Sequence, residues 1–546
     1  MKNLLTTCLF LCCLLAVRAA DNPNVKKLFT VTSGELKLTF MVGTDNRLYQ
    51  LAFGDASREV TPPAKMPSRE WEFLPPYGNG VLTEPAIQAT HVDGNTSTEL
   101  HYTAHRTETL APGVEQTVIS LKDPAYPFSV DIYIKCYADQ SMMEIWNTVT
   151  HNEKGKVVLH RFASASPVVK AKEYWLTQFA GNYKREATLS EERLSEGVKI
   201  LDSKLGVRAH QMRIPSFILS LGGQARENEG EVLAASLRWS GSFQFAFDMD
   251  WNKNLRLLTG MNPLGSQYNL ERGGTFTTPA ILYTYSRQGK GEASRRFHRW
   301  AMANAVRDAE KDRPVLLNNW EATYFDFNER KLLSLAKDAA KLGAELFVLD
   351  DGWFGARDND AKGLGDYTVN RKKLPGGLAG LAEKVHALGL LFGLWFEPEM
   401  VNADSGLFRA HPDWIVQTPG NVPATGRNQY VLDLCRAEVQ DYIIANVNAT
   451  LASAPIDYVK WDMNRHISDN YSPALAEQGR FSHSYILGLY RVLQSIVEQN
   501  PDVLFEGCSS GGNRFDLGIL CYMPQIWTSD DTDAYERQLI QAGTSY

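Results

Sequence analysis

The sequence predicts a multidomain protein, in which a large antiparallel β-sandwich precedes a (β/α) barrel. Apolar and polar residues alternate with a period of two from about residue 25 to about residue 285, and short apolar strands alternate with amphipathic helices after Pro314. The first pattern is typical of strands buried on one face. The second lacks a dinucleotide-binding glycine motif, which favours a barrel over a doubly wound sheet. A length of 546 residues allows two or more domains.

The N-terminus has the features of an export signal. A basic start is followed by an apolar run from Leu4 to Val17 and then by Arg18-Ala19-Ala20. This predicts a signal peptide over residues 1–20, with cleavage after Ala19 or Ala20, and therefore a periplasmic or extracellular protein. No later stretch reaches 18 consecutive apolar residues, so we expect no membrane span.

Composition excludes several other classes of function. The formal net charge is -7 and there is no long run of Lys and Arg, so nucleic acid is not an expected partner. The cysteines beyond the signal peptide show neither metal-ligand spacing nor a dense disulfide pattern. No His, Asp and Glu spacing indicates a catalytic metal, and we expect no cofactor.

The first domain is predicted over residues 21–290. Phe128, Val130, Ile132 and Ile134 face one way in an alternating segment that is typical of the whole region. From Gly291 to Asp308 the periodicity becomes helical and the residues are charged, which indicates a linker helix within 291–313.

The second domain is predicted over residues 314–546. Its expected strands are Val315 to Leu317, Leu346 to Leu349, Leu391 to Phe396, Tyr458 to Trp461, Val503 to Phe505 and Ile526 to Trp527. Its expected helices are 332–342, Leu378 to Leu388, Ala437 to Val447 and Tyr485 to Gln499. These are six strands, whereas a closed barrel needs eight, so we expect a fragment with a (β/α)8-type barrel that is incomplete at the C-terminus.

Acidic and polar residues follow the predicted strands at their carboxyl ends. They are Asp350 and Asp351, Glu397 and Glu399, Lys460 and Asp462, Cys508, and Asp530 and Asp531. The loops at this edge converge on the catalytic face of a barrel. Helix N-capping explains some of these residues, but it does not explain Asp followed by Asp, or Lys-Trp-Asp.

The clustered carboxyl groups suit glycoside hydrolysis with retention, which needs a nucleophile and an acid about 5 to 5.5 Å apart. Asp462 suits the nucleophile, because Lys460 lies on the same strand face and favours a charged carboxylate. A local ion pair between these two residues is the alternative. For the acid, Asp530 is nearest its strand, but sequence spacing does not choose between Asp530 and Asp531.

Five motifs occur in an order that resembles bacterial α-galactosidases of glycoside hydrolase family 36. They are Asp350-Asp351-Gly352-Trp353-Phe354, Gly393-Leu394-Trp395-Phe396-Glu397-Pro398-Glu399-Met400, Lys460-Trp461-Asp462-Met463-Asn464-Arg465, Cys508-Ser509-Ser510-Gly511-Gly512 and Trp527-Thr528-Ser529-Asp530-Asp531-Thr532-Asp533. The resemblance implies an N-terminal β-supersandwich, a catalytic barrel and a third, C-terminal β-domain, which we expect to be absent from residues 1–546. It also implies that the protein is a tetramer.

The resemblance further implies a role for each site residue. Asp462 would be the nucleophile and Asp530 the general acid/base, while Asp350 and Asp351 would bind the 4- and 6-hydroxyls of galactose. The other implied pocket residues are Trp395, Arg427, Lys460, Asn464 and Cys508. Cys508 is equally well explained as a small buried residue. Tyr183 stands where relatives often carry Trp in a loop over the pocket, which puts the leaving-group subsite in question.

The predicted function is therefore retaining hydrolysis of terminal, non-reducing α-D-galactose from melibiose- or raffinose-type oligosaccharides or galactosylated glycans. Two alternatives on the same scaffold are an α-N-acetylgalactosaminidase and a transgalactosylase. A non-catalytic galactoside-binding protein is the alternative from another class. The presence of both candidate carboxylates in the sequence favours an enzyme over a non-catalytic binding protein.

Overall fold

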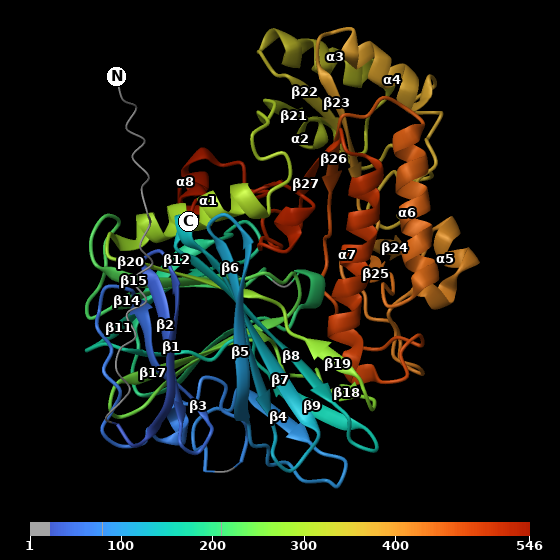
Figure 1. Ribbon diagram of the computed structural model, residues 1–546. Coiled ribbons are helices and arrows are strands. Elements are labelled where there is room, and N and C mark those ends of the chain that lie inside the picture. Colours follow the sequence, from blue (N-terminus) through green and yellow to red (C-terminus); the bar gives the residue numbers. More distant parts are fainter. Residues whose placement is uncertain (1–21, 79, 209) are drawn as a thin grey trace, which may run out of the picture.

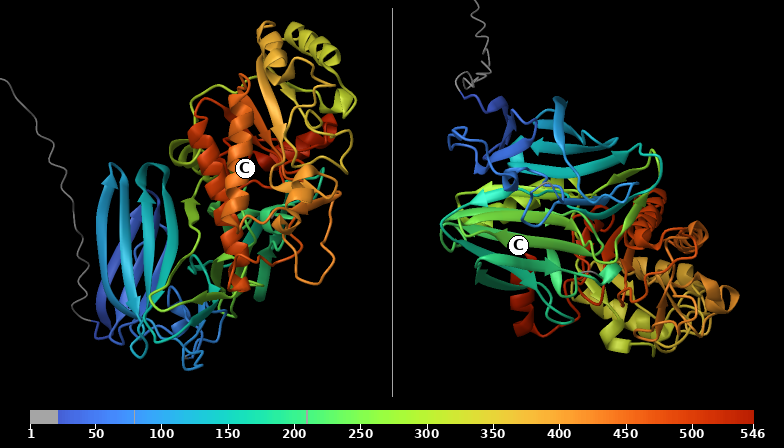
Figure 2. Two further views of the ribbon diagram at one scale, coloured as in Figure 1. Left: turned by 90° about the vertical axis from the view of Figure 1, so that its right-hand side faces the viewer. Right: turned by 90° about the horizontal axis from the view of Figure 1, so that it is seen from below.

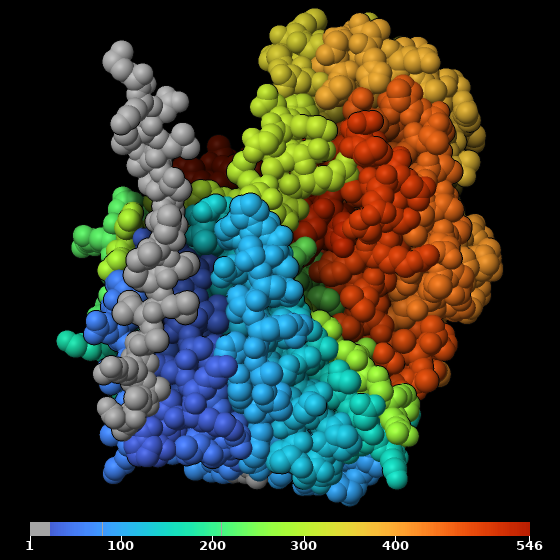
Figure 3. All heavy atoms as spheres, viewed as in Figure 1, coloured from blue at the N-terminus to red at the C-terminus, as the bar shows by residue number. Residues whose placement is uncertain are grey.

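A computed structural model describes residues 22–78, 80–208 and 210–546, so the predicted signal peptide lies outside the described residues. The chain forms a β-rich N-terminal part, drawn in blue to green, and an α/β part in yellow to red (Figure 1). Figure 3 shows that the second part lies against one side of the first. In the described part of the chain, no helix is both long and apolar enough to cross a membrane.

The largest sheet of the N-terminal part is antiparallel and ten-stranded, in the order β12-β11-β14-β15-β20-β8-β7-β6-β5, with β19 also paired to β8. Its strands are β5 (His101–Ala111), β6 (Val114–Lys122), β7 (Phe128–Tyr137), β8 (Met142–His151), β11 (Tyr174–Ala180), β12 (Thr188–Arg193), β14 (Arg213–Leu221), β15 (Glu231–Leu237), β19 (Thr275–Thr277) and β20 (Ile281–Ser286). In β7 the buried residues alternate with partly exposed ones, as predicted, because one face packs on the core.

Three smaller sheets complete the β-rich part. One contains β1 (Val25–Ser33), β2 (Leu36–Gly43) and β3 (Leu48–Asp55). Another contains β10 (Val168–Lys170), β17 (Asn254–Met261), β16 (Phe243–Met249) and β13 (Gly197–Asp202), and a third contains β18 (Tyr268–Leu270), β9 (Val157–Phe162) and β4 (Ile87–Thr90). Aromatic side chains such as Phe217, Phe245 and Phe247 fill the space between sheets in edge-to-face contacts. The predicted antiparallel sandwich is thus confirmed.

The second part is built on a parallel sheet with the order β21-β22-β23-β26-β27-β28. The strands are β21 (Leu316–Asn318), β22 (Leu346–Leu349), β23 (Leu391–Phe396), β26 (Tyr458–Trp461), β27 (Leu504–Gly507) and β28 (Gln525–Ile526). The helices are α1 (Gly289–Asn304), α2 (Trp320–Thr323), α3 (Glu329–Lys341), α4 (Gly377–His386), α5 (Gly406–Ala410), α6 (Ala437–Ala452), α7 (Phe481–Gln499) and α8 (Ala534–Thr544). Every strand and helix predicted after residue 290 is present within a few residues.

The sequence did not predict a hairpin that follows β23. Strands β24 (Met400–Asn402) and β25 (Gln429–Val431) pair antiparallel, and the long excursion between them includes α5. Two short strands inside a barrel connection give too little periodicity to detect. The hairpin bears on the candidate site, because Gln429 is the first residue of β25 and Arg427 lies just before that strand.

The two parts lie side by side in both further views (Figure 2), and loops at the carboxyl ends of β26 and β27 contact the β-sandwich. A β-sandwich segment around the 3-10 helix η3 (Gly206–Arg208) contacts these loops directly. Ile467 N donates to Leu205 O at 3.0 Å, and His210 N donates to Asn513 O at 3.1 Å. The candidate site is therefore bordered by both parts of the chain.

Candidate active site

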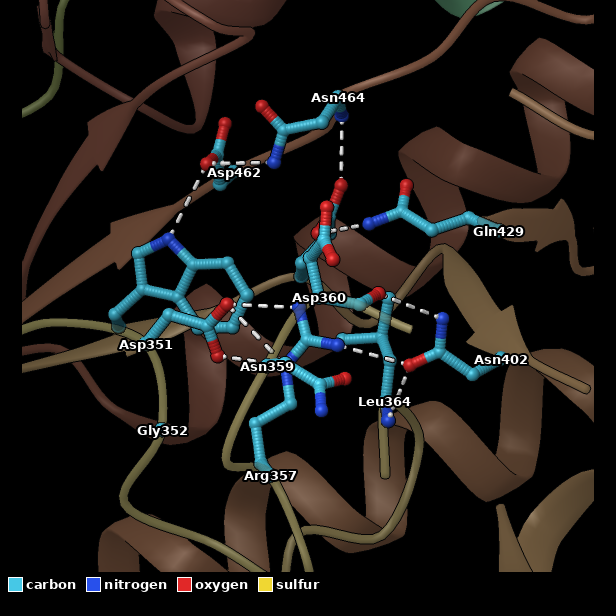
Figure 4. Close-up of polar contacts among 12 residues, drawn as sticks. Asp351, Gly352, Arg357, Asn359, Asp360, Leu364, Asn402, Gln429, Asp462 and Asn464 are labelled. Carbon is cyan, nitrogen blue, oxygen red and sulfur yellow. Dashed lines mark hydrogen bonds and ion pairs between the residues drawn. The ribbon is translucent and has the colours of Figure 1, made fainter. Parts of the chain in front are cut away.

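Asp462 lies directly after β26 and is joined to Asn464 in the network of polar contacts that Figure 4 shows. Its Oδ2 accepts hydrogen bonds from Trp395 Nε1 at 3.2 Å and from Asn464 Nδ2 at 2.8 Å. Its Oδ1 accepts from the backbone N–H groups of Met463 at 2.9 Å and Ser510 at 3.4 Å. Four donors from three different strand ends fix the orientation of this carboxylate.

The same surroundings keep Asp462 ionised. Burial by itself would raise the pKa of Asp462, but the cations Lys460 and Arg427 and the hydrogen bond from Asn464 outweigh burial and lower the pKa below its usual range. A buried carboxylate with a lowered pKa and a fixed orientation has the properties of a nucleophile.

The ion pair of Lys460 is made with Asp350. Lys460 Nζ donates to Asp350 Oδ2 at 2.8 Å, and Asn318 Nδ2 donates to the same oxygen at 2.6 Å. Asp350 follows β22, two strands away from β26 in the sheet. The local pair between Lys460 and Asp462 that the sequence left as an alternative is therefore not the ion pair that forms.

Asp351 has a cation of its own, Arg357, which the sequence did not indicate. Arg357 Nε donates to Asp351 Oδ1 at 2.9 Å and Nη2 donates to Asp351 Oδ2 at 2.7 Å, with both side chains buried (Figure 4). Arg357 Nη1 also donates to Asn402 Oδ1 at 2.8 Å. Burial acts most strongly on Asp351 and raises its pKa, although Arg357 opposes the rise. The loop position of Arg357 gives no sequence signal for this role.

Glu397, after β23, is a third buried carboxyl group beside Asp462. Its Oε1 accepts from Asn464 N at 2.7 Å and its Oε2 accepts from Gln429 Nε2 at 2.8 Å. Burial first, and then the charge of Asp462, raises the pKa of Glu397 to about 8. Asn464 donates to both carboxyl groups, so Glu397 helps to fix the position of Asn464 and, through it, of Asp462.

Asp530 follows β28, and its pKa is shifted in the opposite direction to that of Asp462. Its Oδ1 accepts from Trp527 Nε1 at 2.8 Å. Burial and then the charge of Asp462 raise the pKa of Asp530, against the opposing effects of Lys460 and Arg427. A raised pKa favours the protonated form of Asp530, which is the form that a general acid needs.

The neighbouring acidic residues serve the local backbone. Asp531 Oδ1 accepts from Asp533 N at 3.0 Å, and Asp533 caps α8 by accepting from the backbone N–H groups of Tyr535 and Glu536. Asp530 is free of these backbone roles, and the charge of Asp462 contributes to its raised pKa.

Arg427 and Cys508 complete the surroundings of the nucleophile. Arg427 lies in a left-handed backbone conformation, with φ of 52°, in the excursion that ends in β25. Its pKa is raised because the charges of Glu397, Asp462, Asp351 and Asp530 outweigh the effect of burial. Cys508 is 3% exposed, and burial and the charge of Asp462 raise the pKa of its thiol. Sulfur therefore stays protonated and can donate to Asp462.

The β-sandwich also contributes side chains to this site. Tyr183 is 47% exposed, and burial of its hydroxyl followed by the charge of Asp530 raises its pKa. Glu186 is buried, and its pKa is raised by burial and also by Asp530. Arg208 of η3 is buried and donates to the backbone carbonyls of Ser509 and Asn464. Neither Glu186 nor Arg208 stood in a recognisable motif.

The structure thus brings all ten predicted site residues to one region. In the described ranges, no group of three or more His, Cys, Asp and Glu side chains has the arrangement of a metal site. The region combines one carboxyl group with a lowered pKa, Asp462, and one with a raised pKa, Asp530. Beside them lie two carboxylates that are paired with cations, Asp350 with Lys460 and Asp351 with Arg357.

Comparisons with known proteins agree with this arrangement. Residues 275–546 match the Melibiase family, and residues 42–271 match the N-terminal domain of glycosyl hydrolase family 36. Alpha-galactosidase AgaA of Geobacillus stearothermophilus is 39% identical over 563 residues, which cover 96% of this chain and 77% of AgaA. Alpha-galactosidase Mel36A of Lactobacillus acidophilus is 40% identical over 84% of this chain and 65% of its own length.

The solved structures show the same relationship. The crystal structure of AgaA superposes with a TM-score of 0.91 at 38% identity, covering 95% of this chain and 77% of AgaA. Two crystal structures of AgaA variants, in complex with stachyose and with raffinose, give the same TM-score. The fold, the ordered motifs and these matches together place the chain in glycoside hydrolase family 36.

Proposed function

We propose that this chain is a retaining α-galactosidase, in which Asp462 is the nucleophile and Asp530 the general acid/base. The observation that carries the assignment is the placement of the two carboxyl groups after strands of one parallel sheet, with Asp462 oriented by four donors and Asp530 held by Trp527 Nε1. The pKa shifts, downward for Asp462 and upward for Asp530, support it. Pairs of carboxyl groups whose surroundings separate their pKa values divide into an ionised and a protonated partner. This division is what a double displacement at a glycosidic carbon requires.

In the first step, a carboxylate oxygen of Asp462 forms a bond to the anomeric carbon while the glycosidic C–O bond breaks. The proton of Asp530 goes to the leaving oxygen. In the second step, Asp530 takes a proton from water as the water oxygen bonds to the anomeric carbon, and the bond to Asp462 breaks. Both enzyme groups return to their starting protonation states, and the anomeric configuration is retained.

Specificity for galactose is assigned to the carboxylates after β22. Asp350 and Asp351 are held by Lys460 and Arg357. A carboxylate has about four lone-pair directions, so each retains acceptor capacity for the 4- and 6-hydroxyls. A sugar with an equatorial 4-hydroxyl would leave buried acceptors unpaired, which is costly.

The proposed substrates are terminal α-galactosides of the raffinose type. Support comes from the stachyose and raffinose complexes of AgaA variants. An α-N-acetylgalactosaminidase would prefer the nitrophenyl glycoside of N-acetylgalactosamine over that of galactose, so the ratio of the two kcat/KM values tests this rival. A transgalactosylase would give transfer products in excess of free galactose at high acceptor concentration.

The decisive experiment uses azide with two matched variants and an activated α-galactoside. Asp462→Gly should be nearly inactive and should yield β-galactosyl azide, because azide takes the place of the carboxylate. Asp530→Gly should yield α-galactosyl azide, because azide then attacks the galactosyl-enzyme. Asp531→Gly should release galactose without azide. If Asp462→Gly retains activity and forms no azide product, the assignment is wrong.

We also propose that the protein is exported and assembles as a homo-oligomer. Export is supported by the basic and apolar residues at positions 1–20, and oligomerisation by resemblance alone. Cell fractionation and the N-terminal sequence of the mature protein test the first proposal. Light scattering of the purified protein tests the second, since a monomer would contradict it.

A further inference from the structure

Arg208 is a buried cation of the β-sandwich, and it contacts the loops after β26 and β27 that hold Asp462. Its Nε donates to Ser509 O at 3.1 Å and its Nη1 donates to Asn464 O at 3.3 Å. Arg208 is 8% exposed. Within the described ranges its guanidinium donates to carbonyl groups and forms no ion pair with a carboxylate, which is unusual for a buried charge.

The two carbonyl groups that Arg208 binds belong to the two loops that hold Asp462. Asn464, after β26, donates to Asp462 Oδ2 at 2.8 Å, and Ser510, after β27, donates from its backbone N–H to Asp462 Oδ1 at 3.4 Å. The same loops are joined by a hydrogen bond from Ser510 Oγ to Asn464 Oδ1. One guanidinium therefore spans the loops that orient the two oxygens of the nucleophile.

The fold fixes Arg208 in this position. Gly206, with φ of +70°, packs so closely that an added Cβ would lie 2.8 Å from Ile467 Cβ. Ile467 N donates to Leu205 O at 3.0 Å on one side of Arg208, and His210 N donates to Asn513 O at 3.1 Å on the other. The β-sandwich segment is thus clamped to both strand-end loops, and the guanidinium has little freedom to move.

The charge of Arg208 also acts on the site. Burial lowers the pKa of Arg208, and the largest opposing effect comes from Asp462. The other charged or titratable groups that face Arg208 are Cys508, Arg427, Asp530, His466 and Tyr183. Those that face Asp462 are Lys460, Arg427, Cys508, Glu397, Asp530 and Arg208.

We propose that Arg208 is a positioning residue for Asp462, through which the β-sandwich holds the strand-end loops of the barrel in their catalytic arrangement. The inference rests on the proposed role of Asp462 as nucleophile. It assigns the β-sandwich a part in the chemical step. Loss of the guanidinium would let Asn464 and Ser510 shift, and misplacement of a reacting group by about 1 Å can cost about 100-fold in rate.

The test compares Arg208→Gln and Arg208→Lys with Arg256→Gln as a matched control. Arg256 is also buried in the β-sandwich and forms no ion pair with any residue that the structure describes. Its guanidinium donates to Ser166 and to the backbone carbonyls of Glu70 and Glu72, which all belong to the β-sandwich. Three quantities are measured for each full-length variant: kcat and KM for a nitrophenyl α-galactoside, the pH profile of kcat/KM, and the unfolding temperature.

Arg208→Gln should lower kcat roughly 10- to 100-fold with little change in KM, and it should move the acidic limb of kcat/KM to higher pH. Arg208→Lys should keep the acidic limb near the wild-type position but still lower kcat, because an ammonium lacks the planar fork that spans two carbonyl groups. Arg256→Gln should lower the unfolding temperature and leave kcat and the limb unchanged.

The proposal is overturned if Arg208→Gln changes kcat and the limb no more than Arg256→Gln does. If Arg208→Gln does not fold, Arg208→Lys decides, since wild-type kcat in that variant would contradict a positioning role. The assignment of Asp462 is tested separately, because the absence of β-galactosyl azide with Asp462→Gly would contradict it. The two hypotheses can therefore fail independently.

Discussion

Lys460 Nζ lies 2.8 Å from Asp350 Oδ2, so the cation nearest the nucleophile in the sequence is bonded to a carboxylate 110 residues away. Burial by itself would lower the pKa of Lys460, but Asp350, Cys508 and Asp462 raise it well above its usual value. One ammonium thus neutralises a proposed sugar-binding carboxylate and lowers the pKa of the proposed nucleophile. The proposed substrate recognition by Asp350 and the ionisation of Asp462 therefore both depend on the charge of Lys460.

Lys460→Met is expected to destabilise the protein and to impair the chemical step. Removal of one partner leaves Asp350 buried without its cation, which costs about 3–5 kcal/mol in the free energy of unfolding. The acidic limb of kcat/KM should move to higher pH, because the pKa of Asp462 rises when Lys460 is removed. Urea denaturation and the pH profile measure the two effects.

Two further variants make this prediction specific. Adding Asp350→Asn to Lys460→Met should recover part of the stability, since no unpaired charge remains, but should not recover activity. Lys341→Met removes an exposed pair with Asp338 and should cost at most about 1 kcal/mol. Equal losses for Lys460→Met and Lys341→Met would show that the buried pair has no special importance.

Arg357→Lys is expected to raise KM for galactosides. A lysine keeps the charge but cannot reproduce the two-pronged contact with Asp351 or the bond to Asn402, so the orientation of Asp351 is lost. We expect kcat/KM to fall at least roughly tenfold, by analogy with other lost charge-assisted bonds. Arg409→Lys, in an exposed pair with Asp404, is the control and should leave kcat/KM unchanged.

The pH profile of kcat/KM should be bell-shaped. Activity requires ionised Asp462, whose pKa is lowered, and protonated Asp530, whose pKa is raised. Activity should therefore fall at acidic pH as Asp462 gains a proton, and at higher pH as Asp530 loses one. Asp530→Asn should abolish the basic limb with activated substrates, whereas Asp531→Asn should keep both limbs. If the basic limb persists in Asp530→Asn, a group other than Asp530 causes that limb.

Glu397→Gln should preserve most activity at pH 6 and change the pH dependence of stability. With its pKa raised to about 8, Glu397 is largely protonated at pH 6, and glutamine resembles that form. A carboxyl group with a raised folded-state pKa stabilises the folded state fully below its unfolded pKa and loses this contribution as pH rises through about 8. The wild type should therefore lose stability relative to the variant across this window in urea titrations. A parallel pH dependence of both proteins would mean that Glu397 is ionised throughout.

Much of this architecture was predictable because its signals are local. The strands Leu346–Leu349, Leu391–Phe396 and Tyr458–Trp461 have the boundaries expected from their apolar runs. The motifs after these strands also placed the acidic residues correctly, since parallel strands bring their carboxyl ends to one edge. The hairpin of β24 and β25 was missed, because its two three-residue strands are separated by a long irregular segment.

The sequence by itself determined the two-part fold, the family and the set of carboxyl groups that meet at the strand ends. Only the tertiary structure decided how their charges are paired: Lys460 with Asp350, Arg357 with Asp351, and Arg208 with the carbonyl groups of Asn464 and Ser509. The physical reason is the sequence distance over which each kind of interaction acts. Periodicity and motifs reflect neighbours along the chain, whereas the pKa of a buried carboxyl group depends on cations that distant segments bring within a few ångströms.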